Sequence, residues 1–229
     1  KCKKKLRAID MIPIASYLIL KGQCHFCKKP IASQYVYLEI FSGLIFVATY
    51  LKFALAEDGL TFYQSMAHSL PYLLPNLLLY LLYAGFFIGI FFYDLKHNEI
   101  PDIFLFPFIG ISFIGSLIIG NSLSSMIIGI MIALLFFGGQ IVISKGKWLG
   151  EGDLYLGLSM ANIFGWQLLL LSIVISYTLG ALWSIYLLAS KQVTGKTQIP
   201  FAPFLVLGSF ITIFFGQEIL GWYLQTLII

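Results

Sequence analysis

Two acids in this sequence lie where an apolar run meets a polar connection. Asp94 directly follows AGFFIGIFFY, and Asp153 directly precedes LYLGLSMANIF. An ionisable group at the edge of a lipid-buried segment is costly to desolvate, so an acid kept there is a candidate functional group. Two carboxyl groups brought together at such an edge do not easily both ionise, and they share a proton. An aspartic protease uses such a pair: one carboxylate takes a proton from water, and the protonated partner polarises the scissile carbonyl.

Three further acids lie in the same two connections, YDLKHNEIPD and KWLGEGDLYLG. They are Glu99, Asp102 and Glu151, so that five of the ten acidic residues are concentrated in these stretches. For these three, the simpler interpretation is that a short loop must be polar and that an acid caps the following helix.

Two glycines, Gly150 and Gly152, flank Glu151 just before Asp153. Glycine lacks a Cβ, so the backbone can adopt conformations closed to other residues and another chain can approach closely. A peptide substrate needs that access. Glycine is also common in membrane helices, where it ends or packs a helix. The two glycines are therefore candidate active-site residues chiefly because two acids accompany them.

The elements that must position these residues are membrane helices. Hydrophobic residues make up 59% of the 229-residue chain and charged residues 10%, and the mean hydropathy is +0.92. Such a composition is typical of a polytopic membrane protein, and backbone groups in lipid must be satisfied within each segment, which favours helices. We predict an all-α transmembrane bundle of seven spans: 36–56, 71–93, 103–120, 124–144, 154–165, 167–190 and 201–226. The fifth is short, so it and the sixth are expected to form a tight helical hairpin.

Basic residues predict the orientation, because they stay preferentially on the cytoplasmic side. Thirteen of the fourteen lie before the first predicted span or in alternate connections: Lys1, Lys3, Lys4, Lys5, Arg7, Lys21, Lys28, Lys29, Lys96, Lys145, Lys147, Lys191 and Lys196. The exception is Lys52, whose long side chain can reach the outer interface. The segment before Tyr35 and the loops 94–102, 144–153 and 191–200 are therefore predicted to face the cytoplasm. The net charge of +4 is a topology signal and shows no spacing typical of nucleic-acid binding.

Cys24 and Cys27 form a CxxC pair in the basic segment that precedes the first span. Disulfides are disfavoured in the cytoplasm, and this spacing lets two thiolates bind one metal ion from a tight turn that Gly22 would assist. Cys2 supplies a third sulfur, and His25 is a further possible ligand. The sequence is thus compatible with two alternatives, a zinc site and a loop that holds no metal.

Four stretches, in order along the chain, resemble the type IV prepilin peptidase family. This family comprises bifunctional leader peptidases and N-methyltransferases within the GxGD class of membrane aspartyl proteases. The stretches are AIDMIPIASYLILKGQCHFCKKPIASQYVYLEIFSGLIF, DLKHNEIPD, GEGDLYLGLSMA and TQIPFAPFLVLGSF. Tyr93 and Asp94 also resemble the presenilin and signal peptide peptidase motif, but the Pro-Ala-Leu motif of those proteins is absent from this sequence.

The resemblance implies a catalytic dyad of Asp94 and Asp153, with Asp102 in the acidic position after the Ile-Pro pair. It implies a prepilin or pseudopilin substrate in the bacterial cytoplasmic (inner) membrane, cut at the cytoplasmic face. It also implies methylation of the new N-terminus with S-adenosylmethionine, although no glycine-rich nucleotide loop is found. We expect two domains, a basic cytoplasmic segment at 1–34 and a transmembrane protease bundle at 35–229.

The resemblance further implies one more transmembrane helix upstream of Lys1, followed by a first CxxC pair. Cys2 falls where the second cysteine of that pair would lie. Glu39 resembles a recurrent family position, and we interpret it as a partner of Lys28 or Lys29 in preference to a methyltransferase residue. Glu218 is predicted at the outer surface.

Two other classes of protein fit the same acids. In a transporter, Asp94 and Asp153 would relay protons or bind a cation at broken helices, but such acids usually lie near the midplane among internal repeats, which are not visible here. In a non-enzymatic assembly subunit, the acids would cap helices and the CxxC pair would clip a loop. Replacement of Asp94 or Asp153 by Asn separates the three, because only the protease loses prepilin cleavage while it stays folded.

Overall fold

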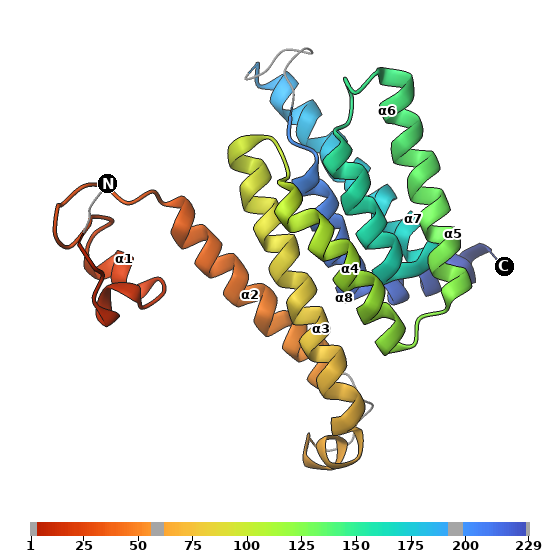
Figure 1. The fold of residues 1–229 in the computed structure, drawn as a ribbon, viewed down its shortest axis with the longest axis horizontal. Coiled ribbons are helices and arrows are strands. Elements are labelled where there is room, and N and C mark those ends of the chain that lie inside the picture. The colour runs from red at the N-terminus through yellow and green to blue at the C-terminus, as the bar shows by residue number, and fades with distance from the viewer. Residues whose placement is uncertain (1–3, 56–61, 192–198, 228–229) are drawn as a thin grey trace.

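The structure is all-α, as the hydrophobic runs predict. The computed structural model describes residues 4–55, 62–191 and 199–227 (Figure 1). Its elements in order are a short 3-10 helix Ala8–Met11, α1 Ala15–Ile19, α2 Gln34–Leu55, α3 Phe62–His97, α4 Asp102–Ile119, α5 Leu123–Ala133, a π-helical turn Leu134–Gly138, α6 Gly139–Ser144, α7 Glu151–Ala189 and α8 Ala202–Leu227.

Six helical stretches of the described residues are long and apolar enough to cross a membrane. They are Gln34–Lys52, Leu74–His97, Asp102–Ile119, Leu123–Ser144, Glu151–Ala189 and Ala202–Thr226. The sequence predicts seven spans, and the difference lies in α7. The predicted segments 154–165 and 167–190 are the two halves of this helix, which is interrupted by a non-helical residue, Gly165. The second half returns toward the starting face, since Tyr177 contacts Phe201 at the start of α8 with ring centroids 4.7 Å apart.

The break in α7 depends on glycine. Gly165 has φ 66° and ψ −173°, a region that is essentially restricted to glycine. A Cβ at this position would collide with the hydroxyl of Ser125. Three side chains of the α4–α5 region bond the backbone groups around the break: Ser116 Oγ to the Asn162 carbonyl (2.6 Å), Asn121 Nδ2 to the Ile163 carbonyl (3.1 Å) and Ser125 Oγ to the Trp166 N–H (3.4 Å). The reversal is therefore hydrogen-bonded where water is scarce.

Helix α7 lies at the centre of the bundle, packed against α4, α5 and α8. The buried core joins large side chains of several helices, among them Tyr83 and Phe87 of α3, Phe108 of α4, Phe137 of the π-helical turn and Met160 of α7. The end of α3, the start of α4, the end of α6 and the starts of α7 and α8 lie at one face of the bundle, which we call the pocket face. In Figure 1, α2 and the segment before it lie to one side of this bundle.

Two polar contacts involve α2: one joins it to α8 in the bundle, and the other joins it to the segment before it. At the face opposite the pocket, Lys52 Nζ lies 2.7 Å from Glu218 Oε1, so the one basic residue outside the predicted cytoplasmic set has an acidic partner. Near the pocket face, Glu39 accepts a hydrogen bond of 2.7 Å from the Ile14 N–H. Among the described residues, ion pairs join only Arg7 to Asp10 and Lys52 to Glu218. The predicted pairing of Glu39 with Lys28 or Lys29 is thus not found.

Candidate aspartyl site

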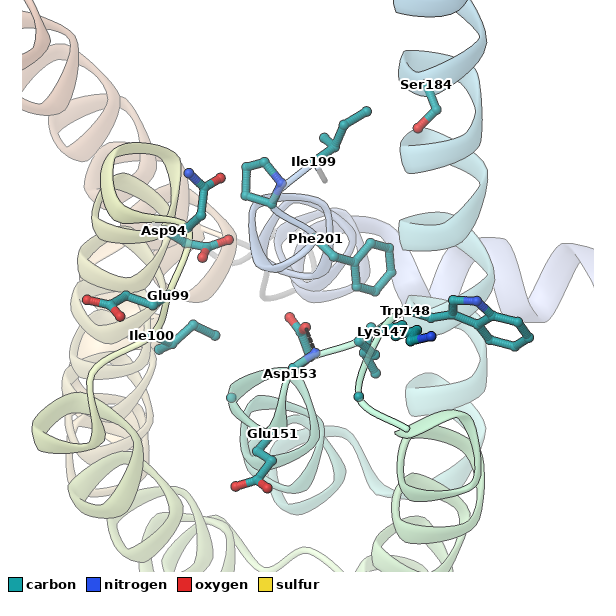
Figure 2. A pocket seen from close by; sticks show the side chains of 16 residues that line it. Asp94, Glu99, Ile100, Lys147, Trp148, Glu151, Asp153, Ser184, Ile199 and Phe201 are labelled. Atoms are coloured by element: carbon teal, nitrogen blue, oxygen red, sulfur yellow. Dashed lines mark hydrogen bonds between the residues drawn. The ribbon is translucent and has the colours of Figure 1, made fainter. Parts of the chain in front are cut away.

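A pocket of about 620 Å³ opens at the pocket face, between segments that are far apart in the sequence. Its walls come from the end of α3 and the loop that follows, the loop between α6 and α7, the start of α7, Ser184 in the second half of α7, and the start of α8. Asp94 and Asp153 both line it. Figure 2 shows their carboxyl groups entering the same space from different helices, beside Phe201.

Asp94 lies three residues before the end of α3 and is only 4% exposed. Its carboxyl group accepts a hydrogen bond from the backbone N–H of Ala202. Ala202 is the first residue of α8, and the first N–H groups of a helix have no partner within it and carry partial positive charge. The start of α8 therefore holds the Asp94 carboxyl group in place and compensates part of its desolvation.

Asp153 is held in the same way by a second helix. It lies in the first turn of α7, is 9% exposed, and its Oδ2 accepts a hydrogen bond of 3.2 Å from the Gly150 N–H. Two acids, each bonded to a backbone N–H at the start of a helix, thus share one pocket. The arrangement can do the acid and base chemistry described above.

The two glycines serve this site differently from what the sequence suggests. Gly150 has φ −84° and ψ 159°, and Gly152 is not among the residues with positive φ, so neither uses the conformations reserved for glycine. Close approach is needed at Gly152, because a Cβ there would lie 3.2 Å from two side-chain carbons of Ile100. The approaching chain is the protein's own loop after Asp94. Gly152 therefore brings the two aspartate regions together.

Several pocket residues escape the sequence reasoning. Glu99 and Glu151, interpreted as loop acids, line the pocket at its exposed edge, together with Lys147. Asp102 does not line it and is an exposed residue in the first turn of α4. Phe201 also lines the pocket. The available signal was the Ile-Pro pair just before Phe201, which echoes the Ile-Pro pair after Asp94 in the sequence.

The CxxC loop is a tight turn, as Gly22 suggests. Gly22 has φ 71°, the Cys24 N–H donates to the Lys29 carbonyl at 2.8 Å, and the Lys28 N–H donates to the Cys24 carbonyl at 2.9 Å. The described residues contain no group of three or more His, Cys, Asp or Glu side chains able to hold a metal ion. Cys2 lies outside the described residues. Zinc therefore has no support from the described part of the chain.

Two protein families match parts of the chain. Residues 1–53 match the bacterial peptidase A24 N-terminal domain, and residues 81–185, which contain both aspartates, match the type IV leader peptidase family. No solved structure matches the chain.

Several curated proteins match almost the whole chain. A protein of Stutzerimonas stutzeri is 26% identical over 98% of this chain and 73% of its own length. One of Aeromonas hydrophila is 27% identical over 97% of this chain and 72% of its own, and one of Legionella pneumophila is 27% identical over 97% and 73%. All three are named prepilin leader peptidase/N-methyltransferase. The chain is an integral membrane protein and belongs to the type IV leader peptidase family.

Proposed function

We propose that this protein removes the basic leader from type IV prepilins or pseudopilins, with Asp94 and Asp153 as its catalytic residues. The observation that carries the proposal is the convergence of these two buried carboxyl groups in one open pocket. The matched families are peptidase families, and nothing in the comparisons supports the transporter alternative.

The chemistry needs one ionised and one protonated carboxyl group. The carboxylate takes a proton from a water molecule as that water attacks the carbon of the scissile carbonyl, and the protonated partner gives its proton to the carbonyl oxygen. As the tetrahedral intermediate collapses, the C–N bond breaks and the leaving amine takes a proton from the carboxyl group that accepted it from water. A hydroxyl group of the intermediate gives its proton to the other carboxylate, which restores the starting state of the dyad. The N–H groups of Gly150 and Ala202 hold the two carboxyl groups throughout.

The position of the pocket suits a substrate with a basic leader and an apolar stem. The stem lies in the bilayer while the leader stays in water, so the bond between them arrives at the depth of Asp94 and Asp153. At the exposed edge of the pocket, the two acids Glu99 and Glu151 outnumber the one lysine, Lys147, and this balance favours a cationic leader. We infer that the pocket face is the cytoplasmic face of the bacterial inner membrane, because Lys96, Lys145, Lys147 and Lys191 lie at the helix ends of that face.

The protein is also proposed to methylate the new N-terminal amine, as the names of its relatives state for those proteins. S-adenosylmethionine supplies the methyl group in such reactions. Its ribose hydroxyls and its ammonium group call for carboxylate partners. The second pocket of the chain, between α2 and α3, has no Asp or Glu in its lining. That pocket therefore does not fit the donor.

We propose the boundary between the two domains at residues 34 and 35, where α2 begins. The zinc prediction for Cys2, Cys24 and Cys27 stays a prediction. Metal analysis of the purified protein, before and after replacement of Cys24 and Cys27 by Ser, tests it.

Co-expression with a candidate prepilin tests the proposed cleavage. Wild-type protein should yield the shorter product, whereas Asp94→Asn and Asp153→Asn should leave the precursor intact. Asp102→Asn is the matched control, because Asp102 lies outside the pocket, and should cleave normally. Because one carboxyl group must be ionised and the other protonated, the cleavage rate should be bell-shaped in pH. A rate that is flat across the pH range where carboxyl groups titrate contradicts the dyad.

A further inference from the structure

A second pocket, of about 920 Å³, lies between α2 and α3 and has no part in the chemistry proposed above. We call it the α2–α3 groove. Its lining consists of Ser33 just before α2, of Gln34, Tyr37, Ile40, Phe41 and Leu44 on α2, and of Phe91, Phe92, Leu95 and Lys96 on α3. The two helices meet at its floor, where the rings of Phe41 and Phe91 stack with centroids 5.4 Å apart.

The lining is ordered from polar to apolar. Ser33, Gln34 and Lys96 lie at the end near the pocket face, and Ile40 and Leu44 lie deeper, since α2 runs away from that face. The eleven residues from Gln34 to Leu44 make ten steps with a rise of about 1.5 Å each, which is a span of about 15 Å. This is half of the ~30 Å thickness of the hydrocarbon core. The groove therefore matches an amphiphile that occupies one leaflet, with its head at the interface.

The charge of the groove's lining favours an amphiphile with an anionic headgroup. Lys96 is exposed at the polar end, and no acid is among the lining residues. One N–H of the Gln34 side-chain amide donates to the Phe92 carbonyl at 3.4 Å. The Lys96 ammonium group and the hydroxyls of Ser33 and Tyr37 are further donors in the lining that a ligand can use. These groups attract a phosphate. They repel the basic leader of a prepilin, so the groove does not suit the junction of leader and stem.

We propose that the α2–α3 groove is a binding site for an anionic phospholipid, with its phosphate at Lys96 and Ser33 and an acyl chain along Ile40, Phe41 and Leu44. In the described residues, α2 packs mainly against α3, and the window of α2 that could span the membrane is only 6% buried. A lipid in the groove bridges the two helices. It thereby fastens the N-terminal part of the chain to the bundle that carries the aspartates.

Native mass spectrometry of the full chain in detergent tests the site. The purified protein is titrated with phosphatidylglycerol and, separately, with phosphatidylcholine. Wild-type protein should retain phosphatidylglycerol about fivefold more tightly, the factor expected for one basic residue near an anionic headgroup. Lys96→Gln should remove that preference. Lys145→Gln, which removes an exposed basic residue from the same face outside the groove, should keep it.

A second pair of variants tests the acyl part of the site. Ile40→Trp fills the groove and should weaken retention of both lipids, whereas Ile143→Trp, on an exposed position of α6, should not. Circular dichroism checks that each variant is folded. If Ile40→Trp does not fold, the result for Lys96→Gln alone tests the proposed site. Equal phosphatidylglycerol retention by wild type and Lys96→Gln overturns the proposal. Displacement of the lipid by a peptide of a mature pilin's apolar helix also overturns it, because the groove would then belong to the substrate.

Discussion

The helices α3 to α8 and the N-terminal part of the chain before α3 are built in different ways. The buried core begins at Tyr83 and includes side chains of α3, α4, α7 and α8, whereas Thr49 is the only buried residue described between 4 and 52. The N-terminal part is attached to the bundle by the packing of α2 against α3 and by the contact of Lys52 with Glu218, whereas Glu39 bonds the Ile14 N–H within the N-terminal part. The proposed cleavage site therefore belongs to the packed bundle of α3 to α8. Mutations in the N-terminal part should therefore leave the rate of cleavage nearly unchanged.

Outside the dyad itself, the largest effect should come from the N–H group that holds Asp94. Ala202→Pro removes this donor, and proline is tolerated at the first position of a helix. A hydrogen bond to a charged group contributes about 1.5–3 kcal/mol, so cleavage should slow by roughly 10- to 100-fold. Ala202→Gly keeps the N–H and should cleave at nearly the wild-type rate. Rates of prepilin cleavage in detergent provide the measurement, and equal rates for the two variants would contradict the role of Ala202.

The break in α7 offers the next test. Gly165→Ala places a Cβ in a backbone region that excludes it and against Ser125, so the free energy of unfolding should fall by about 1–3 kcal/mol. Gly138→Ala is the control, because a Cβ there meets nothing within 4 Å. Thermal unfolding followed by circular dichroism compares the two. The bundle would not depend on the hairpin if Gly165→Ala unfolded no earlier than Gly138→Ala.

Breaking the Glu39 contact should disturb the N-terminal part and leave the bundle of α3 to α8 intact. Glu39→Leu deprives the Ile14 N–H of its acceptor and loosens the N-terminal segment. If methylation is carried by the N-terminal part, methylation of the processed pilin should slow by at least about tenfold, the factor for the lower end of the range of about 1.5–3 kcal/mol that a hydrogen bond to a charged group contributes. Cleavage should be nearly unchanged. Mass spectrometry of the product resolves cleaved from cleaved and methylated pilin. Parallel loss of both activities would show that the N-terminal part is needed for the aspartyl site.

The smallest effect is expected at the opposite face. Lys52→Gln breaks the ion pair with Glu218, whose side chain is 59% exposed. Exposed pairs contribute about 0–1 kcal/mol, so the midpoint of thermal unfolding should change little. Cleavage should not change, because both residues lie far from the pocket face. A large loss of stability would mean that this pair, rather than packing against α3, fastens α2.

The sequence predicted most of the fold because lipid imposes simple rules. The runs 103–120 and 124–144 became Asp102–Ile119 and Leu123–Ser144 within one residue at each end, since a membrane helix must be apolar throughout. The internal break at Gly165 was anticipated only as a short span followed by a hairpin. Its cause, three hydrogen bonds from the α4–α5 region, depends on residues some forty positions away in the chain.

The candidate site was predictable in part. Asp94 and Asp153 were recognisable because an acid at the end of an apolar run is expensive. The contribution of Ala202 was not, because a backbone N–H leaves no trace in the residue type. Glu99 and Glu151 look like ordinary loop acids until the loops close around one pocket. Residues whose role depends only on where the fold places them can be recognised only from the three-dimensional structure.

The most direct test of the account is a double-variant comparison at the dyad. Cleavage rates of purified Asp94→Asn, Asp153→Asn and the double variant are measured against wild type on one prepilin. If the two carboxyl groups act as a unit, each single change should lower the rate by about 10²- to 10⁴-fold, and the double change should cost little more than either alone. Substantial cleavage by either single variant, or losses that multiply in the double variant, would contradict a shared catalytic role.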